Sequence, residues 1–354
     1  MKLSHSQYLS FIDKLYGNFQ FSKSGIKKLP KGQINYHKKN FSKFFDINSN
    51  NFKNLNVLET GAGPGVHASI LAMMGANVLA LDASRTNIKK IHNLKNLYKL
   101  GNLSFRKFDL TKQYNVKEKF DLISCHNWVQ HTPNPYSVIL KLNKNLKDKG
   151  KFYISCYHGN TFRFFVSQIS RSILKKSDLN TALKKSIYRF TDNFKKYGDV
   201  DIICLENLFD DFFTPYCVTT TYKKLTQDMK SIGYKVLKKG KENNQIELID
   251  NQVLRCSFIK NSKIANHKFN NFTRPINEFE KSKINIKNKC SDLAKKVILK
   301  FSKSDINTRL DICFSLYEIR ALHHKEKNDQ RYFHLFEYLK SIYYDDNARL
   351  LLDR

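Results

Sequence analysis

Three glycines at alternate positions follow an acid in the segment 57–65, which reads VLETGAGPG. The acid is Glu59, and the glycines are Gly61, Gly63 and Gly65. Glycine allows a turn with positive φ and lets a ligand come close to backbone N–H groups. If a helix follows the turn, its N-terminus favours the negative part of that ligand. The spacing therefore predicts a ligand-binding turn, and a tight turn without a ligand is the alternative.

Two further acids end apolar segments of the chain. Asp82 stands 17 residues after Gly65, and Asp109 ends the next apolar segment. A carboxylate at the first position can accept hydrogen bonds from both hydroxyls of a ribose, and one at the second can accept from an adenine amino group. Alternatively, each acid caps a helix, which is worth about 1 kcal/mol. Together with the glycine turn, the two acids favour a nucleotide-like ligand.

Short apolar segments alternate with amphipathic ones over residues 55–157. This pattern predicts strands at 55–60, 77–82, 103–110, 120–126 and 151–157, and helices at 66–74, 84–98 and 135–146. A last strand is expected at 252–260. Such alternation is typical of a parallel, doubly wound α/β sheet with right-handed crossovers. The glycine turn then lies between the first strand and the first helix, at the edge of the sheet where ligands bind.

The glycine spacing differs from the dinucleotide fingerprint G-x-G-x-x-G, whose third glycine would replace Val66. The pattern E-x-G-x-G-x-G resembles the first motif of class I S-adenosylmethionine-dependent methyltransferases. LALDAS and FRKFDL resemble their second and third motifs, and segment 120–135 is similar to the type 11/type 12 group. The resemblance covers about residues 50–160 and resumes at 208–236. It implies an α/β fold with a doubly wound, mostly parallel, seven-stranded Rossmann-like sheet, and S-adenosyl-L-methionine as cofactor.

The resemblance also implies roles for residues at the ends of the first four predicted strands. Around the methionine part of the cofactor it places Glu59, Gly61, Ala62, Gly63 and Gly65. For the ribose and the adenine it implies Asp82, Ala83, Asp109 and Leu110. At the reacting end it implies His126 and Asn127.

Methyl transfer from a sulfonium needs alignment, exclusion of water and sometimes a proton acceptor. Candidate bases in the sequence are His126, His131, Tyr157, His158, Asp211 and Tyr216. Members of the group often carry two histidines before T-P, whereas this chain has Gln130 and then His131, so a structural role for His131 is also open. Segment 210–216, DDFFTPY, resembles the substrate-side loop of the group. The catalytic residues we expect are His131, Asp211 and Tyr216.

The composition carries a net charge of +31, which would suit a nucleic acid. Lysine supplies most of this charge and is spread along the whole chain, however, and arginine is the residue favoured for bidentate phosphate recognition. We interpret the excess mainly as a composition bias, with an anionic substrate or membrane surface as alternatives. The 7 cysteines are scattered without a C-x-x-C pair, and the first residues lack the apolar run of a signal peptide. We therefore expect no metal site and a cytoplasmic protein.

Three regions are predicted from these patterns. Residues 1–50 form a helical or irregular N-terminal cap, in which Gly17, Gly25, Pro30 and Gly32 are turn signals. Residues 51–262 form the methyltransferase domain with a helical insertion at about 160–205, and 263–354 a helical C-terminal extension. The insertion could meet lipid, and the C-terminal helices could form a homodimer. We expect methyl transfer to a small or medium-sized acceptor such as a sugar, a quinone-like compound or a lipid-linked metabolite. An RNA methyltransferase, or a non-catalytic subunit that binds a partner, is the alternative.

Overall fold

The computed structural model describes residues 10, 13, 28–112, 115–132, 134–157, 214, 220–240 and 253–261. The predicted helical insertion and C-terminal extension, and with them the membrane and dimer contacts, lie outside the described residues. The same holds for segment 210–216 apart from Thr214. Within the described residues, no helix is both long and apolar enough to cross a bilayer.

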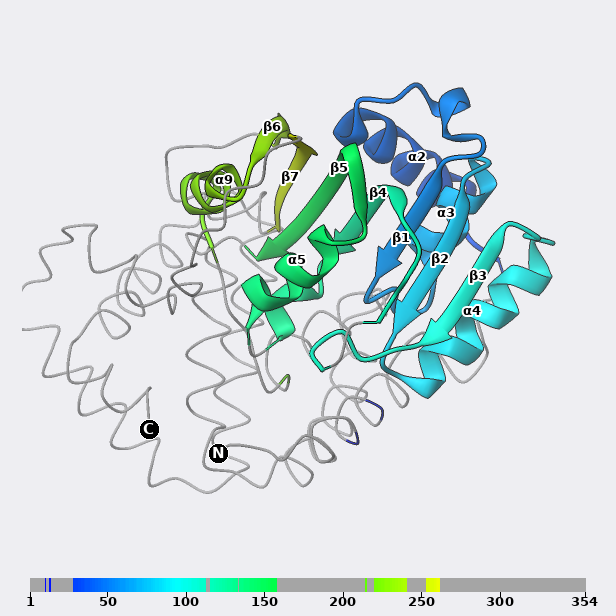
Figure 1. Cartoon of the computed structure of the whole chain (residues 1–354). Coiled ribbons are helices and arrows are strands. Elements are labelled where there is room, and N and C mark those ends of the chain that lie inside the picture. Colours follow the sequence, from blue (N-terminus) through cyan, green and yellow to red (C-terminus); the bar gives the residue numbers. More distant parts are fainter. Residues whose placement is uncertain are drawn as a thin grey trace, which may run out of the picture.

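Seven strands of the described chain form one sheet in the order β3-β2-β1-β4-β5-β7-β6 (Figure 1). They are β1 Asn56–Thr60, β2 Asn77–Asp82, β3 Leu103–Lys107, β4 Phe120–His126, β5 Leu146–Tyr157, β6 Tyr234–Lys239 and β7 Val253–Lys260. Strands β1 to β5 pair in parallel, whereas β7 pairs antiparallel with β5 and β6. The strand order reverses between β1 and β4, so ligands are expected at the carboxyl ends of these two strands. The predicted mostly parallel, seven-stranded sheet is confirmed.

The helices of the described chain connect and cover these strands. They are α2 Lys31–Phe45, α3 Val66–Met73, α4 Arg85–Leu97, α5 Pro135–Asn143 and α9 Tyr222–Ser231, with short 3-10 helices η1 Ser49–Phe52 and η2 Val129–His131. The N-cap residues of α4, α5 and α9 are Ser84, Asn134 and Thr221, whose side chains each accept a hydrogen bond from the backbone N–H three residues further on. The N-cap of α3 is Gly65, which has no side chain to cap the helix, so the first N–H groups of α3 face the glycine turn.

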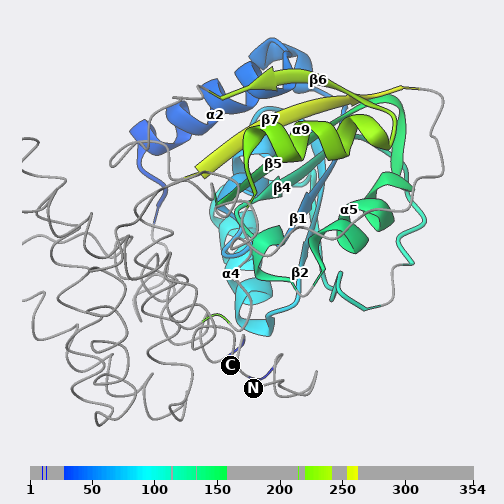
Figure 2. The same ribbon diagram turned by 90° about the vertical axis from the view of Figure 1, so that its left-hand side faces the viewer.

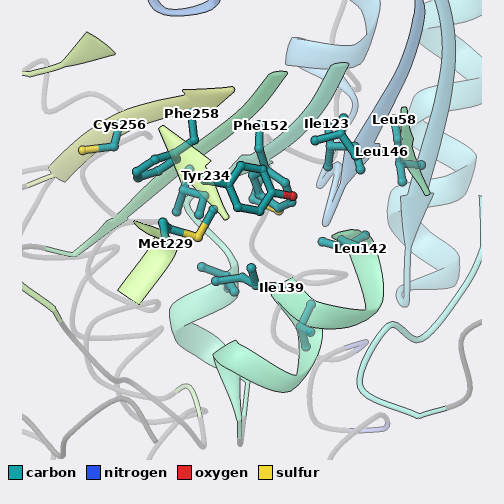
Figure 3. Close-up of a cluster of buried hydrophobic side chains, with 14 of the residues drawn as sticks. Leu58, Ile123, Ile139, Leu142, Leu146, Phe152, Met229, Tyr234, Cys256 and Phe258 are labelled. Atoms are coloured by element: carbon teal, nitrogen blue, oxygen red, sulfur yellow. The ribbon is translucent and has the colours of Figure 1, made fainter. Parts of the chain in front are cut away.

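Two helical layers enclose the sheet (Figure 2). Helices α5 and α9 cover one face, where Ile139, Leu142 and Met229 pack against Phe152 and other apolar strand residues (Figure 3). Helices α2, α3 and α4 cover the other face, and the buried phenylalanines of α2 belong to the same core as apolar residues of α3 and α4. At about 25 cal/mol per Å² of buried apolar surface, these two cores are the main source of stability. They hold the carboxyl ends of β1 and β4 in fixed positions.

Two predicted strand boundaries and one predicted turn are wrong. Strand β3 ends at Lys107, because Asp109 forms a local turn in which its Oδ1 accepts hydrogen bonds from the N–H and the hydroxyl of Thr111. Strand β5 begins at Leu146, five residues before the predicted start. It already pairs with β4 at Leu146, and a shift in register separates this pair from those that begin at Lys151. Gly32, interpreted from the sequence as a turn signal, lies inside α2.

Candidate active site

The three glycines of the turn differ in what surrounds them. All three have positive φ, 57° at Gly61, 53° at Gly63 and 87° at Gly65. A Cβ on Gly61 would lie 2.2 Å from Cγ of Trp128, and one on Gly65 would lie 2.6 Å from Cγ1 of Ile91. At Gly63, no atom of the described residues comes within 4 Å of that position. Two glycines therefore make room for the protein's own side chains, and Gly63 faces open space.

Asp82 fastens the glycine turn to the end of β2. Its carboxylate accepts hydrogen bonds from the N–H groups of Gly63 and Ser84, both at 2.8 Å, and from Nδ2 of Asn87 at 3.0 Å. Burial raises the pKa of Asp82 to about 6, against the opposing effect of these hydrogen bonds. A carboxylate offers about four acceptor sites, so one is left for a ligand hydroxyl. The carboxylate thus shapes the turn as well as facing the site.

Asn87 is a candidate site residue that was not expected from the sequence. Its side chain is buried, and its Oδ1 has no hydrogen-bond partner among the described residues. A buried amide oxygen without a partner is costly, and a ligand hydroxyl could satisfy it. The signal was present in the sequence, because Asn87 lies in the first turn of the helix that follows Asp82.

The other residues expected around the cofactor differ in how exposed they are. Ala83 follows β2 and is partly exposed, whereas Leu110 is buried in the core beneath α5 and α9. Asp109 lies in the turn after β3 described above, not at the end of the strand. Ala62 is buried, and its N–H donates to the carbonyl of Leu81 at 3.0 Å.

Glu59 is a buried acid on β1, two residues before the glycine turn. It is fully buried on β1, and neither carboxylate oxygen has a partner among the described residues. Burial raises its pKa to about 8, and Ser124, its register partner on β4, lowers the value only in part. Near neutral pH the free protein therefore keeps Glu59 largely protonated. A cationic ligand group would remove this cost by pairing with the carboxylate.

Three histidines, His37, His67 and His126, lie together beside Glu59, and we call them the histidine strip. The ring centroids of His67 and His126 are 3.7 Å apart, those of His37 and His67 are 4.6 Å apart, and Nδ1 of His67 is 4.0 Å from Oε1 of Glu59. His126 was expected at the site, whereas His37 on α2 and His67 on α3 were missed. The sequence places them on three separate elements, so only the fold brings them together.

All members of the histidine strip are neutral near neutral pH. Burial is the first cause, and the positive charge of Arg255 adds to it, lowering the pKa of His37 to about 4 and that of His126 to about 3. The pKa of His67 is also lowered, by burial and by the neighbouring histidines and Arg255. Nδ1 of His126 is buried without a hydrogen-bond partner among the described residues. No group of three or more potential ligands in the described chain has a metal-binding arrangement. The neutral rings can therefore accept hydrogen bonds, while their lowered pKa values make them weak bases.

Asn127 and His131, two predicted site residues after β4, are held by neighbouring protein groups. Asn127 has a positive φ of 54°, and its N–H donates to the carbonyl and hydroxyl oxygens of Ser155 at 3.0 and 3.1 Å. His131 is 5% exposed at the end of η2, and its ring lies edge-on to Tyr157 with centroids 5.4 Å apart. Asp211 and Tyr216 lie outside the described residues. Of the three predicted site residues after β4 that the structure describes, His126 joins the histidine strip, whereas Asn127 and His131 are held by other protein groups.

Comparison with known proteins gives the class of this chain. The profile of a family described as a methyltransferase domain matches residues 51–240, more than half of the chain. The chain belongs to this family, and its seven-stranded sheet is that of the class I S-adenosylmethionine-dependent methyltransferases.

Relatives with curated names cover a part of the chain. A ubiquinone biosynthesis O-methyltransferase of Rickettsia conorii is 29% identical over 156 residues, which are 43% of this chain and 52% of the relative. One of Pelagibacter ubique is 32% identical over 127 residues, 35% of this chain and 51% of the relative. The chain spans about half the length of the curated relatives it matches.

Solved structures match a larger part of the chain at lower identity. A 1,6-didemethyltoxoflavin-N1-methyltransferase of Burkholderia thailandensis has a TM-score of 0.45 and 12% identity, covering 74% of this chain and 92% of the other. A magnesium protoporphyrin IX methyltransferase of Synechocystis, solved with S-adenosylhomocysteine, has a TM-score of 0.41 and 14% identity, covering 71% and 93%. Neither likeness bears on the acceptor of this chain.

The cofactor of this class, S-adenosylmethionine, fits the residues present. Its ammonium group is a suitable partner for the buried carboxylate of Glu59, and its ribose hydroxyls suit the oxygens of Asp82 and Asn87. The open space at Gly63 leaves room for the carboxylate of its methionine part, and the first N–H groups of α3, which no side chain caps, could bind it.

Proposed function

We propose that this chain transfers a methyl group from S-adenosylmethionine to a hydroxyl oxygen of a phenolic, quinone-like acceptor. The observation that carries the proposal is the neutral histidine strip beside the buried carboxylate of Glu59, near the switch point between β1 and β4. Among the described residues, neither oxygen of this carboxylate has a hydrogen-bond partner. A phenol must lose its proton when its oxygen takes a methyl group, and a neutral imidazole nitrogen can accept a hydrogen bond from the phenol and orient it while the proton passes to water. The names of the Rickettsia and Pelagibacter relatives support oxygen as the methylated atom.

The cofactor supplies an activated methyl group, and the chain holds it in one orientation. Glu59 would pair with its ammonium group, while Asp82 and Asn87 would hold the ribose. We keep the wider set expected from the sequence as a proposal: Gly61, Ala62, Gly63, Gly65, Ala83, Asp109, Leu110, His126 and Asn127. Because methyl transfer needs little covalent help, this alignment is the main contribution of the protein.

The protein's own groups would then handle the proton of the acceptor. The three rings lie in mutual contact, with the centroids of His37 and His126 6.2 Å apart, and a hydroxyl bound against the strip would have an unprotonated ring nitrogen within reach. His131, Asp211 and Tyr216 remain proposals for orienting the acceptor. The three predicted regions, 1–50, 51–262 and 263–354, also remain a proposal, although α2 of the first region packs on the sheet of the second.

The proposed function is tested by incubating the full chain with S-adenosylmethionine and catechol, with aniline as the matched amine. Mass spectrometry should show a methylated phenol with S-adenosylhomocysteine formed in equal amount, and no methylated amine. Methylation of aniline alone would contradict oxygen as the methylated atom. Binding of S-adenosylhomocysteine without turnover of any phenol would favour the alternative of a non-catalytic subunit.

A further inference from the structure

The hydroxyl of Thr60, the last residue of β1, lies at the centre of a buried hydrogen-bond cluster. Thr60 is completely buried, and its register partner on the neighbouring strand β4 is Cys125. Its Oγ1 donates to the carbonyl oxygen of Ser124 at 2.9 Å, lies 3.0 Å from Sγ of Cys125 and accepts a hydrogen bond from Nε1 of Trp128 at 3.0 Å. These contacts join the ends of β1 and β4, the two strands at the switch point in strand order.

Every hydrogen-bonding capacity of this hydroxyl is used. A hydroxyl has one proton to donate and two lone pairs that accept. The proton goes to the carbonyl of Ser124, so the lone pairs are left for the indole N–H of Trp128 and the thiol of Cys125. Burial raises the pKa of the Cys125 thiol, so this group keeps its proton and can donate it. A methyl group in place of the hydroxyl would remove all three contacts at once and take away the acceptor of the indole N–H.

Trp128 connects this hydroxyl to the glycine turn. The residue after Thr60 is Gly61, the first glycine of the turn, and a Cβ on it would collide with Cγ, Cδ1 and Cδ2 of the indole. The indole therefore lies directly against the backbone of the turn. One ring thus binds the Thr60 hydroxyl through its N–H and contacts the turn through its carbons.

Packing alone does not fix the ring in this place. Trp128 is partly buried and packs against the core beneath α5 and α9. Apolar packing is non-directional, whereas a hydrogen bond has a preferred length and angle. The bond to Thr60 therefore decides which atoms of the indole face Gly61, and with them where the first peptide of the turn lies.

We infer that Thr60 is a positioning residue for the cofactor: by holding Trp128, its hydroxyl fixes the backbone of Gly61 and hence the turn that receives the methionine part of S-adenosylmethionine. The inference rests on the placement of the cofactor in the proposed function and does not depend on the acceptor. Because the side chain of Thr60 is enclosed by protein groups, it acts through Trp128 and touches no reacting atom.

The test is calorimetry of S-adenosylhomocysteine binding with the full chain and three variants. Thr60→Val keeps the shape of the side chain without its hydroxyl and should bind about fivefold more weakly, because a buried hydrogen bond is lost. Thr60→Ser keeps the hydroxyl and should bind within about twofold of the unaltered chain. Tyr234→Phe is the matched control, because it removes another buried hydroxyl, one that donates to Oδ1 of Asn143 at 2.7 Å. This control should melt at a lower temperature and bind S-adenosylhomocysteine with unchanged affinity.

Fluorescence follows the ring itself, because Trp128 is the only tryptophan of the chain. In Thr60→Val the indole loses the hydroxyl that holds it, so acrylamide should quench its emission more strongly at a temperature at which the protein is folded. Thr60→Ser and Tyr234→Phe should match the unaltered chain. Quenching that is equal in all four proteins would show that the hydroxyl does not hold the ring.

A double variant tests whether the hydroxyl acts through Trp128. Trp128→Phe removes the N–H of the pair, so adding Thr60→Val to it should weaken S-adenosylhomocysteine binding by no more than about twofold further. Additive losses would overturn the inference, and so would normal affinity in Thr60→Val with a melting temperature lowered by several degrees. If the unaltered chain binds no S-adenosylhomocysteine, the placement of the cofactor is wrong and the inference falls with it. If the variants behave as expected but no phenol is methylated, the inference stands and the proposed acceptor is wrong.

Discussion

The indole of Trp128 fills the space that a side chain on Gly61 would need. A Cβ on Gly61 would lie 2.2 Å from Cγ of this tryptophan, whose Nε1 donates to the hydroxyl of Thr60 at 3.0 Å. The tryptophan thereby links the segment after β4 to the end of β1. The glycine turn is thus packed against protein at Gly61 and open at Gly63. Substitutions at these two glycines should therefore have different effects.

Gly61→Ala should destabilise the fold, whereas Gly63→Ala should mainly weaken cofactor binding. In the first variant the methyl group collides with Trp128, and the melting temperature should fall by several degrees, as expected for about 2 kcal/mol of overpacking. In the second, only the positive φ is strained, at about 1–2 kcal/mol. S-adenosylhomocysteine should bind Gly63→Ala about tenfold more weakly than the unaltered chain. Equal affinity in calorimetry would place the cofactor away from Gly63, and Gly63→Asn, which tolerates positive φ, controls for backbone strain.

Glu59 should make the free protein less stable as the pH rises. Burial raises its pKa from 4.5 to about 8, so between these values the folded chain binds a proton that the unfolded chain has lost. Stability therefore falls with rising pH through this window. Asp82, whose pKa is raised to about 6, also lowers the stability as the pH rises, but it does so below about pH 6. The histidine strip has lowered pKa values, so its contribution also falls at or below the ordinary pKa of 6.5.

Urea unfolding at about pH 6.5 and about pH 8.5 isolates the contribution of Glu59. The unaltered chain should lose stability between the two pH values, and Glu59→Gln should lose clearly less. A pH dependence that is the same in both proteins would show that the carboxyl group is not protonated in the fold.

Cofactor binding should release protons if Glu59 pairs with an ammonium group. The carboxyl is mostly protonated near neutral pH and must ionise to form the pair, so S-adenosylhomocysteine should displace close to one proton per site. Calorimetry in two buffers with different ionisation enthalpies measures this number. Glu59→Gln should bind more weakly and release none, and proton release that persists in this variant would assign it to another group.

Asp82→Asn should weaken cofactor binding by about tenfold. The change keeps the shape of the side chain but removes the charge that strengthens its hydrogen bonds to the ribose and to the N–H of Gly63. Glu118→Gln is a matched control, because this acid is exposed and paired with Arg106 away from the turn. Calorimetry with S-adenosylhomocysteine should separate the two variants, and affinity within about twofold for Asp82→Asn would contradict a ribose role.

Asp211→Asn and Tyr216→Phe should separate acceptor binding from cofactor binding. Both changes are nearly isosteric, and the loop resembles the substrate-side segment of the type 11/type 12 group. At least one variant should lower methyl transfer by about tenfold, with cofactor affinity unchanged, since an interaction made mainly in the transition state is seen in turnover. Normal turnover with a melting temperature lowered by several degrees would instead assign the loop a structural role.

The sequence alone determined the sheet and the edge at which the cofactor is expected. Periodicity and turn residues are local signals, so strands β2 and β4 have the predicted bounds, and Ser84 caps α4 as its position suggests. The same signals could not locate the end of β3, because a side-chain turn at Asp109 competes with the strand. They also could not show that Gly32 lies within a helix, since packing of the α2 phenylalanines outweighs the low helix propensity of one glycine.

Only the tertiary structure decided which side chains meet. His37, His67 and His126 lie on α2, α3 and β4, and Arg255 lies on β7, so no spacing in the sequence relates them. The strand order brings His126, Ser155 and Arg255 into one row, and the apolar face of α2 holds His37 above it. The glycines show the same division. Their number predicts a tight turn, but whether each one makes room for a tryptophan, an isoleucine or a ligand depends on side chains that arrive from distant elements of the chain.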